Sequence, residues 1–550
     1  MSVTASIAYQ MQLAGTAGAW TDVTDDVLTS LPVSVSYGIR GNGPYDRVAE
    51  SGNIALTLDN SEKNSAGSAG YYSPSAPYVR TGFQVGVPIR VRITYNSNTY
   101  TKFYGRISPE GIQVESGLHG TRRTHITAAD FMEQAAVHEM YLPAFTTSKK
   151  INEVVPLITA NMPITPKGTA YSTGQDTFNT VFDTVRPKTR ALGEFTKLAN
   201  SELGYIYNRF DPTTDEELVV EGRYTRNDAT VLTQLSVGTA GYEYLLMETG
   251  DFLLQENGDK LISAYVAGSV DASFNNTFIE MQTSNGANIF NRVKCVAYPR
   301  KTDGTAVVLA TLQKSIFIGG SATQTDVFLR YRDPQGGVSN VSGRDMVTPA
   351  GTVDYLFNSA EDGSGSDLTA NLTVTPDYGT EGVAYTFVNS GPAGYVTFLQ
   401  ARGLGIYIYD PVELTGEDTT SMGVHGTRVL DFDMKYQDSP LTASSFVTVL
   451  LNQYKNPRTV VDKVTFYANR DETHMVAFLV CEPGSKIHLT EPLSGIDNDY
   501  FINGVEYDIV QKDIIRYTWY VKPASEDTYR LWYLGVVGYS ELGVTTYLGY

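Results

Sequence analysis

Apolar and polar residues alternate with a period of two through most of the chain. The pattern is clearest in residues 32–41, 53–60 and 88–96, each bounded by residues that favour turns. Residues 303–428 continue as short apolar runs separated by Gly, Ser, Asp and Pro. This periodicity predicts a fold that is mainly β, with a β-sandwich of the immunoglobulin-like kind over 303–428.

Helical spacing is confined to a few places. Residues 128–140 can form a short helix, and a second helix is expected after Thr147 and Ser148, which are plausible N-caps. A third is predicted over 190–204, ending at Gly204, and a fourth over 442–455. These segments predict a small α+β portion within the β-rich chain.

At 550 residues the chain is too long for one hydrophobic core, so several domains are expected. The changes in pattern divide it as follows: a β-barrel domain at 1–127, an α+β domain at 128–225, a hairpin-rich connecting segment at 226–302, the inserted β-sandwich at 303–428, a second β-barrel domain with helix 442–455 at 429–522, and a C-terminal docking tail at 523–550.

A tandem repeat with a period of eight occupies residues 245–259. Its acidic-Gly-Asp turns suggest calcium, but the spacing is not that of an EF-hand loop. Asn257-Gly258 is a strong hairpin signal, so a stacked hairpin is the favoured interpretation and an ion site the alternative.

Composition and charge narrow the classes of function. The chain has 37 Tyr and 50 Gly but only 18% charged residues, which suits strands and tight turns. Its net charge of −19 argues against gripping nucleic acid by the phosphates, although an acidic wall would let DNA slide past. Cys295 and Cys481 are expected to be buried thiols rather than a disulfide or metal pair.

No targeting or membrane segment is apparent in the sequence. The first residues have no basic segment followed by an apolar block, so we expect no signal peptide. No run of about 18 apolar residues occurs, so no membrane span is expected.

Two distant segments resemble each other. Gly86 to Gly105 and Gly484 to Gly504 both follow the order strand, turn, strand, turn, over nineteen and twenty residues. If the match is meaningful, the chain carries two similar β-barrels. Three copies would then present six barrels in a ring, which lets a threefold object meet a sixfold tube.

Four segments in order resemble the baseplate or tail-tip hub family of tailed bacteriophages, including hub-like minor tail proteins. They are NIALTLDN followed by YYSPSAPYV, GVPIRVRI, FYGRI and HITAADF; RALGEFTKLANSELGYIYNRFD with LVVEGRYTR; NIFNRVKCVAYPR; and TVLLNQYKNPRTVVDKVTF with GSKIHLTEPLSGIDNDYFINGVEYDI. Together they cover most of the chain except 303–428 and the C-terminal tail.

The resemblance implies a structural virion protein at the tail tip. Such a protein is a homotrimer with two β-barrels per subunit that closes the tail tube and opens for DNA exit. The partners implied are the distal tail protein ring, the tail tube, the tape measure protein, and tip or receptor-binding proteins. DNA would pass through the lumen without specific binding, along a net acidic surface. Trp532 and Tyr547 in the docking tail are expected to be assembly contacts.

Catalytic chemistry is not expected, and neither a cofactor nor a metal is implied. The six histidines form no ligand pair, and no nucleophile elbow, P-loop or dinucleotide fingerprint occurs. Asp431 and Asp433 share one face of a strand, which leaves a polysaccharide-degrading enzyme as one alternative. The other alternative is a host-surface binding protein whose 303–428 sandwich recognises a glycan or protein receptor.

Overall fold

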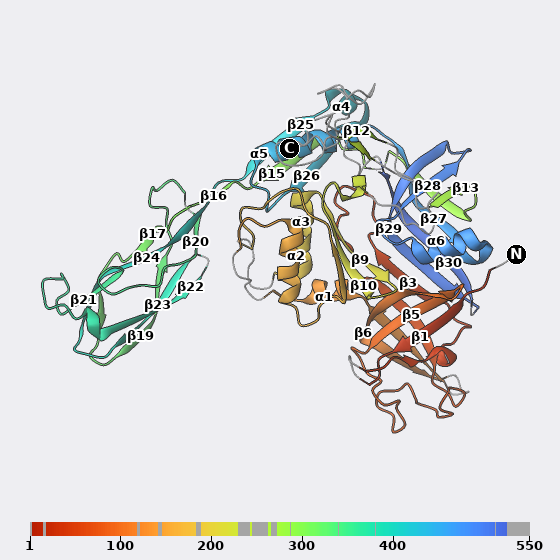
Figure 1. Cartoon of the computed structure of the whole chain (residues 1–550), viewed down its shortest axis with the longest axis horizontal. Helices are drawn as coiled ribbons and strands as arrows, with labels where there is room; N and C mark the ends of the chain where they lie inside the picture. Colours follow the sequence, from red (N-terminus) through yellow and green to blue (C-terminus); the bar gives the residue numbers. More distant parts are fainter. Residues whose placement is uncertain are drawn as a thin grey trace, which may run out of the picture.

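The computed structural model describes most of the chain. The described residues are 3–14, 18–117, 122–140, 146–182, 189–228, 242–244, 262–265, 272–286, 288–338, 340–379, 381–511 and 513–524. The 245–259 repeat, Trp532 and Tyr547 therefore lie outside the described residues. The fold is mainly β, as the periodicity predicts, with a few helices (Figure 1).

Among the described residues, thirteen strands from both ends of the chain form one sheet. Its N-terminal half contains β1 (Ser6–Met11), β2 (Thr21–Asp22), β3 (Val33–Gly38), β4 (Asn53–Asp59), β5 (Pro88–Tyr95), β6 (Asn98–Ser116) and β7 (Arg122–Ala129). Its C-terminal half contains β13 (Ala272–Asn275), β14 (Glu280–Asn285), β27 (Thr459–Tyr467), β28 (Lys486–Glu491), β29 (Ile496–Val510) and β30 (Ile514–Pro523). The halves join where β3 pairs antiparallel with β29, a contact we call the junction.

The two halves repeat one topology. In the N-terminal half, consecutive strands β4 to β7 lie in the spatial order β4-β7-β6-β5. In the C-terminal half, consecutive strands β27 to β30 lie in the order β27-β30-β29, with β28 beside β29. All six pairings are antiparallel. The chain therefore contains the same four-stranded unit twice.

The backbone at the start of each repeated hairpin also matches. Gly86 N–H donates to Ile107 O (2.7 Å), and Ile107 N–H donates to Val87 O (3.0 Å). Gly484 N–H donates to Ile502 O (2.8 Å), and Ile502 N–H donates to Ser485 O (2.9 Å). Both glycines have positive φ, 78° and 96°, a conformation that glycine adopts without steric cost.

The far end of the sequence match needs a correction. Gly105 pairs with Ile89, and the equivalent partner of Ile487 is Tyr500 rather than Gly504. The sequence match aligns the second strands by their glycines. The ladders align them by hydrogen bonds and allow for bulges of different length after Ile107 and Ile502.

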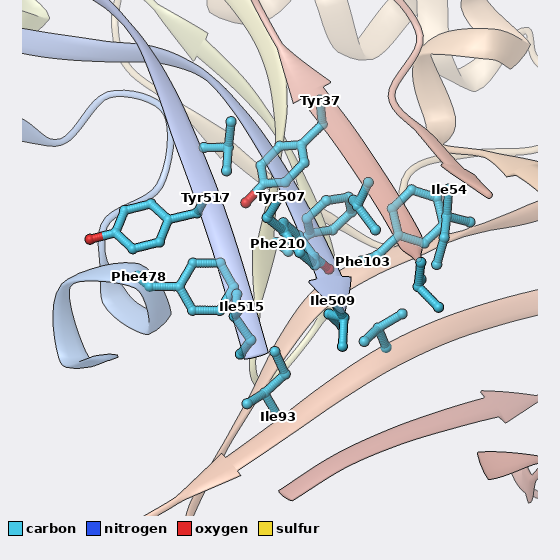
Figure 2. Close-up of a cluster of buried hydrophobic side chains, with 14 of the residues drawn as sticks. Tyr37, Ile54, Ile93, Phe103, Phe210, Phe478, Tyr507, Ile509, Ile515 and Tyr517 are labelled. Atoms are coloured by element: carbon cyan, nitrogen blue, oxygen red, sulfur yellow. The ribbon is translucent and has the colours of Figure 1, made fainter. Parts of the chain in front are cut away.

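One core lies beneath both halves. Figure 2 shows side chains from the two halves and from the neighbouring strand β9 (Tyr205–Asp211) meeting in a single cluster. The rings of Tyr37 and Phe210 are 4.6 Å apart between centroids. Phe478, on helix α6 (Glu472–Val480), packs edge-on to Tyr507 at 5.3 Å. The halves are consequently joined by apolar burial as well as by the strand ladder.

A unit of helices and a small sheet packs beside the junction. It consists of α1 (Phe131–Val137), α2 (Ile151–Ala160), α3 (Ala191–Glu202) and the sheet β8-β10-β9, with β8 (Gly168–Tyr171), β10 (Asp215–Glu221) and the short turn of helix η2 (Thr225–Asp228). The three helices and the β9–β10 hairpin occur where the sequence predicts them.

The ends of two of these helices differ from the prediction. Lys150, rather than Thr147 or Ser148, is the N-cap of α2, and its N–H donates to the Glu153 carboxylate (2.9 Å). Helix α3 ends with Leu203, not Gly204, in the left-handed conformation (φ 57°). The Leu203 side chain is buried in a neighbouring core, and this burial offsets the backbone strain that glycine would have avoided.

A third unit lies between the main sheet and the inserted module. Its sheet has the order β25-β15-β26, with β15 (Arg292–Ala297), β25 (Val412–Glu417) and β26 (Val429–Asp433), and its helices are α4 (Thr419–His425) and α5 (Pro440–Tyr454). The sequence pattern assigns helix 442–455 to the second barrel. In the structure α5 instead packs on β15 and β25, because its apolar face is buried against theirs.

The inserted module is a sandwich of two sheets with its own core, and it projects from the rest of the chain (Figure 1). One sheet is built around β24 (Gly394–Ile408), which pairs with β16 (Arg300–Thr302), β17 (Val307–Thr311), β18 (Ile316–Ile318), β20 (Asn340–Arg344) and β21 (Tyr355–Asn358). The other is β19-β23-β22, with β19 (Thr323–Arg330), β23 (Gly382–Asn389) and β22 (Leu372–Tyr378), and the turn η3 (Thr369–Asn371) precedes β22.

The module is shorter than the predicted 303–428. Strand β25 and helix α4 belong to the third unit instead. Strand β25 forms a ladder with β15 from Arg292 to Ala297, and Ser421 of α4 accepts a hydrogen bond from Asn291, just before β15 (3.3 Å). The remaining elements are the pair β11 (Tyr242–Tyr244) and β12 (Ile262–Tyr265), and the turns η1 (Thr24–Asp26) and η4 (Ala468–Arg470).

Candidate functional site

A buried ion pair holds the two halves of the main sheet together. Lys102 on β6 has no exposed surface, and its ammonium contacts the carboxylate of Glu482, which follows α6. Lys102 also donates to Phe478 O (2.8 Å), and Tyr37 OH donates to Glu482 Oε2 (2.7 Å). Burial raises the pKa of Glu482, while the Lys102 charge opposes that rise. This network links residues up to 445 positions apart in sequence.

A second polar cluster lies where helix α1 follows strand β7, and it contacts the N-terminal half through Gly52, whose N–H donates to Asp130 Oδ1 (2.9 Å). The Asn208 amide donates to Asp130 Oδ2 (3.3 Å) and to Glu216 Oε2 (3.4 Å), and all three residues are buried. Burial raises the pKa of Asp130 to about 7. Burial, and then the charge of Asp130, raise the pKa of Glu216 to about 8. Asp130 is also the N-cap of α1, where Met132 N–H donates to it (3.0 Å).

A third cluster attaches the same unit to the C-terminal half. Arg226 donates to Glu221 Oε2 (2.7 Å) and to Asn503 Oδ1 (3.0 Å). Lys522 donates to the Tyr205 hydroxyl (2.7 Å), and the Arg226 guanidinium lies 3.9 Å from the centre of the Tyr205 ring. The junction is thus held by contacts from three parts of the chain.

The face of the main sheet opposite the core, which we call the outer face, is polar. In the C-terminal half it forms a depression lined by three carboxylates, two cations and hydroxyl groups: Glu280, Glu506, Asp508, Lys463, Arg516, Thr465, Thr518 and Tyr520. Tyr520 OH donates to Glu506 (2.8 Å), and across the junction Ser34 Oγ donates to Asp508 (2.5 Å). The face suits water or a hydrated surface better than an apolar partner.

The carboxylate pair considered in the sequence lies on an open sheet face. Asp431 and Asp433 alternate with buried residues along β26 and so share one face of the strand, as the sequence predicts, and in the structure both are exposed. Lys435 pairs with Asp433 at 2.9 Å. A glycosidase needs two carboxyl groups placed on either side of a bound sugar, and neighbouring positions on one exposed strand do not provide that arrangement.

The described histidines and cysteines do not converge. His488 lies between Asp499 (2.8 Å) and Asp497 (2.9 Å), and His474 contacts Asp471 (2.7 Å). Within the described ranges no group of three or more His, Cys, Asp or Glu residues could hold a metal. Cys295 and Cys481 are buried free thiols, as expected, and burial raises the pKa of Cys295 to about 12.

The sequence did not reveal the contacts at the junction. Lys102 stands in the segment Thr101-Lys102-Phe103, where nothing marks it as buried, because its partner Glu482 is far away in the chain. The repeated glycine at 86 and 484 indicated that the unit occurs twice, but not that its two copies meet.

No described helix is both long and apolar enough to cross a bilayer.

Comparisons with known proteins give a uniform but distant result. No family model matches the chain, and no curated protein matches it. Among solved structures, the chain is similar to the 43 kDa tail protein of prophage MuSo2 from Shewanella oneidensis, with a TM-score of 0.47, 7% identity, and coverage of 95% of this chain and 99% of that chain.

Two further solved structures cover nearly the whole chain. The tail protein from Neisseria meningitidis MC58 has a TM-score of 0.45 and 9% identity over 95% of this chain and 98% of that chain. Prophage tail protein gp18 from Listeria monocytogenes EGD-e has a TM-score of 0.35 and 8% identity over 94% of each chain.

Proposed function

We propose that this protein is a non-catalytic tail-tip or baseplate hub that assembles as a homotrimer and closes a phage tail tube. The observation that carries the proposal is the repeated four-stranded unit, β4 to β7 and β27 to β30, fused in one sheet. One chain then supplies two similar surfaces, and three chains supply six. That arrangement reconciles a threefold tip with a sixfold tube.

The family resemblance of the sequence supports the same role and suggests its partners. These are the distal tail protein ring, the tail tube, the tape measure protein and tip or receptor-binding proteins. DNA would pass through the lumen without specific binding, because carboxylates repel phosphate. The four-stranded units would each contribute to one of the two hub barrels. The C-terminal tail with Trp532 and Tyr547 would provide further assembly contacts.

The decisive experiment determines symmetry and position. Native mass spectrometry of the purified protein should give three copies, and cryo-electron microscopy of virions should place them around an axial channel at the tail tip. The surface lining that channel should be net acidic. A chain that is monomeric in the virion, or a lumen lined by Lys and Arg, would contradict the proposal.

A second candidate function concerns the inserted module alone. It has its own core and projects from the rest of the chain (Figure 1). It also carries an exposed aromatic contact, in which Phe317 (55% exposed) packs edge-on against Tyr395 at 5.3 Å. The module would then recognise a host-surface glycan or protein. Saturable binding of a 300–409 fragment to host cells that is lost in its Phe317→Ser variant would support this. Equal binding of the unchanged fragment and the variant would show that the aromatic pair is not the binding site.

A further inference from the structure

The junction provides a template for how one copy of the chain could contact another. In the C-terminal half, the first part of β29 pairs with β28 as far as Phe501. After a bulge at Asn503, the same edge of β29 pairs with β3 of the other half, from Gly504 to Ile509. One long strand therefore serves its own half first and the neighbouring half second.

The equivalent strand of the N-terminal half has only the first of these partners. Strand β6 pairs with β5 as far as Arg106, then bulges between Ile107 and Ile112. Its last part, Ile112–Ser116, pairs with β7 on one edge, and on the other edge it has no strand partner among the described residues.

Val114 lies in the part of β6 that has one open edge, and its side chain is more exposed than that of the equivalent residue in the other half. Val114 corresponds to Tyr507 when the two halves are aligned by their strand pairs. Ile112 pairs with Ile126 and Val505 pairs with Trp519 at equivalent positions. Val114 and Tyr507 each lie two residues further along the strand. Tyr507 is 1% exposed, whereas Val114 is 45% exposed. An apolar position that the junction covers in one half is thus open in the other.

The missing partner also has an equivalent within the chain. Strand β14 flanks β27 as β3 flanks β4, and both pairings are antiparallel. The second edge of β3 is taken by β29, while β14 ends the sheet in the described part of the chain. Next to β14, Ile279 is 50% exposed. Open strand edges of this kind favour pairing with another chain.

We propose that β14 of one copy pairs antiparallel with Ile112–Ser116 of β6 in the next copy, repeating the junction between subunits. The inference rests on the proposed hub function and adds the surface through which its subunits join. Each interface is heterologous, since β14 of one copy meets β6 of another, and such contacts close into a ring when the rotation permits.

The template also fixes the register of the contact. Ser34 faces Asp508 at the junction. Ser34 is opposite Ala55 and Gln282 is opposite Lys463, which are equivalent positions of β4 and β27. Glu115 pairs with Arg123, and Asp508 pairs with Arg516. Each arginine lies five residues before the residue that pairs with Ile107 or Ile502, so Glu115 and Asp508 are equivalent positions. Glu115 of one copy should therefore face Gln282 of the next.

Paired cysteines test this register in the full-length protein. Opposite residues of an antiparallel pair have Cα atoms roughly 4.5–5.5 Å apart, within the range that a disulfide spans. Glu115→Cys combined with Gln282→Cys should give a covalently closed ring of three chains under oxidising conditions, reversed by reductant. The native Cys295 and Cys481 are buried and should stay reduced.

Two controls make the result specific. Ser34→Cys with Asp508→Cys, at the template pair, should close within one chain and give no covalent oligomer. Glu115→Cys with Asn285→Cys is out of register and should not crosslink. A trimer in native mass spectrometry without the Glu115–Gln282 crosslink would overturn this interface and leave the hub intact. A chain that stays monomeric at every concentration would overturn both.

A substitution at the open edge gives an independent readout. Val114→Asp places a charge where the partner strand should bury an apolar side chain, so association should weaken by at least about tenfold. The unfolding midpoint of the monomer should not change, because Val114 is exposed there. Val424→Asp, at a 72% exposed position on α4, is the matched control and should leave association unaffected. Unchanged association of Val114→Asp would contradict the proposal.

Discussion

At the scale of single residues, the buried charges carry the most specific information. Lys102 and Glu482 form an ionic link between the two halves, and neither side chain has more than 11% of its surface exposed. A buried ion pair contributes little net stability when intact, but the loss of one partner leaves an uncompensated charge. Such residues therefore specify which surfaces meet more than they strengthen the fold.

We predict that Lys102→Met lowers the free energy of unfolding by about 3–5 kcal/mol. The double variant Lys102→Met with Glu482→Gln should regain most of that loss, because no buried charge remains. Lys149→Met, which removes an exposed ion pair between the residue before the N-cap of α2 and Glu153, is the matched control and should leave the free energy of unfolding almost unchanged. Denaturant titration measures all three. Equal small effects would show that Glu482 finds another partner.

The Asp130–Glu216 cluster predicts a dependence of stability on pH. Both carboxyl groups have raised pKa values in the folded protein, about 7 and about 8. The folded state therefore holds protons that the unfolded state has released, and the free energy of unfolding should fall as pH rises from about 4 to about 8. Glu216→Gln keeps a hydrogen-bonding side chain but cannot titrate, so the fall should be shallower. Denaturation at a series of pH values measures the slope, and an unchanged slope would contradict the assignment.

At the scale of elements, the junction depends on two glycines at the β3–β29 crossing. Gly38 has φ +83°, and a Cβ there would lie 2.5 Å from Asn503 O and 2.9 Å from the Cα of Gly504. Both neighbours are backbone atoms, which cannot move away without breaking the ladder. The close approach of two strands from opposite ends of the chain thus requires glycine at this position.

We predict that Gly38→Ala destabilises the protein by more than the backbone cost of about 1–2 kcal/mol, with overpacking adding about 1–3 kcal/mol. Gly67→Ala is the matched control, because Gly67 has φ +65° but nothing within 4 Å of an added Cβ. The control should show the backbone cost alone. If the two variants lose the same stability in denaturant, the close approach does not constrain the junction.

At the scale of the whole molecule, the inserted module is a separable unit. Its buried residues, from Leu309 to Tyr407, form a cluster distinct from the other three. The third unit is not continuous in sequence, because the central strand β15 of its sheet lies before the module and β25 and β26 lie after it. The module can be removed from the chain without cutting a core, whereas the third unit cannot.

We predict that a 300–409 fragment unfolds in one cooperative transition, because its core is complete. A 411–456 fragment, which keeps β25, β26 and α5 but lacks β15, should remain unfolded. Circular dichroism and denaturant titration of the two fragments check this. Cooperative unfolding of the second fragment would show that α5 does not need β15.

The sequence by itself determined the elements that depend on local pattern. Period-two alternation predicted the strands, helical spacing located α2, α3 and α5, and the match of Gly86 with Gly484 indicated the repeated unit. These signals lie within one strand, one helix or one turn, where neighbouring residues set the backbone conformation.

Only the tertiary structure decided which of these elements are neighbours. It placed α5 on β15 instead of in the second half, buried Lys102 against Glu482, and joined β3 to β29. Each of these contacts brings together segments more than a hundred residues apart, as in the 445-residue separation of Tyr37 and Glu482. Such pairings are selected by burial and by the hydrogen bonds of open strand edges, which leave no mark in the local pattern of either segment.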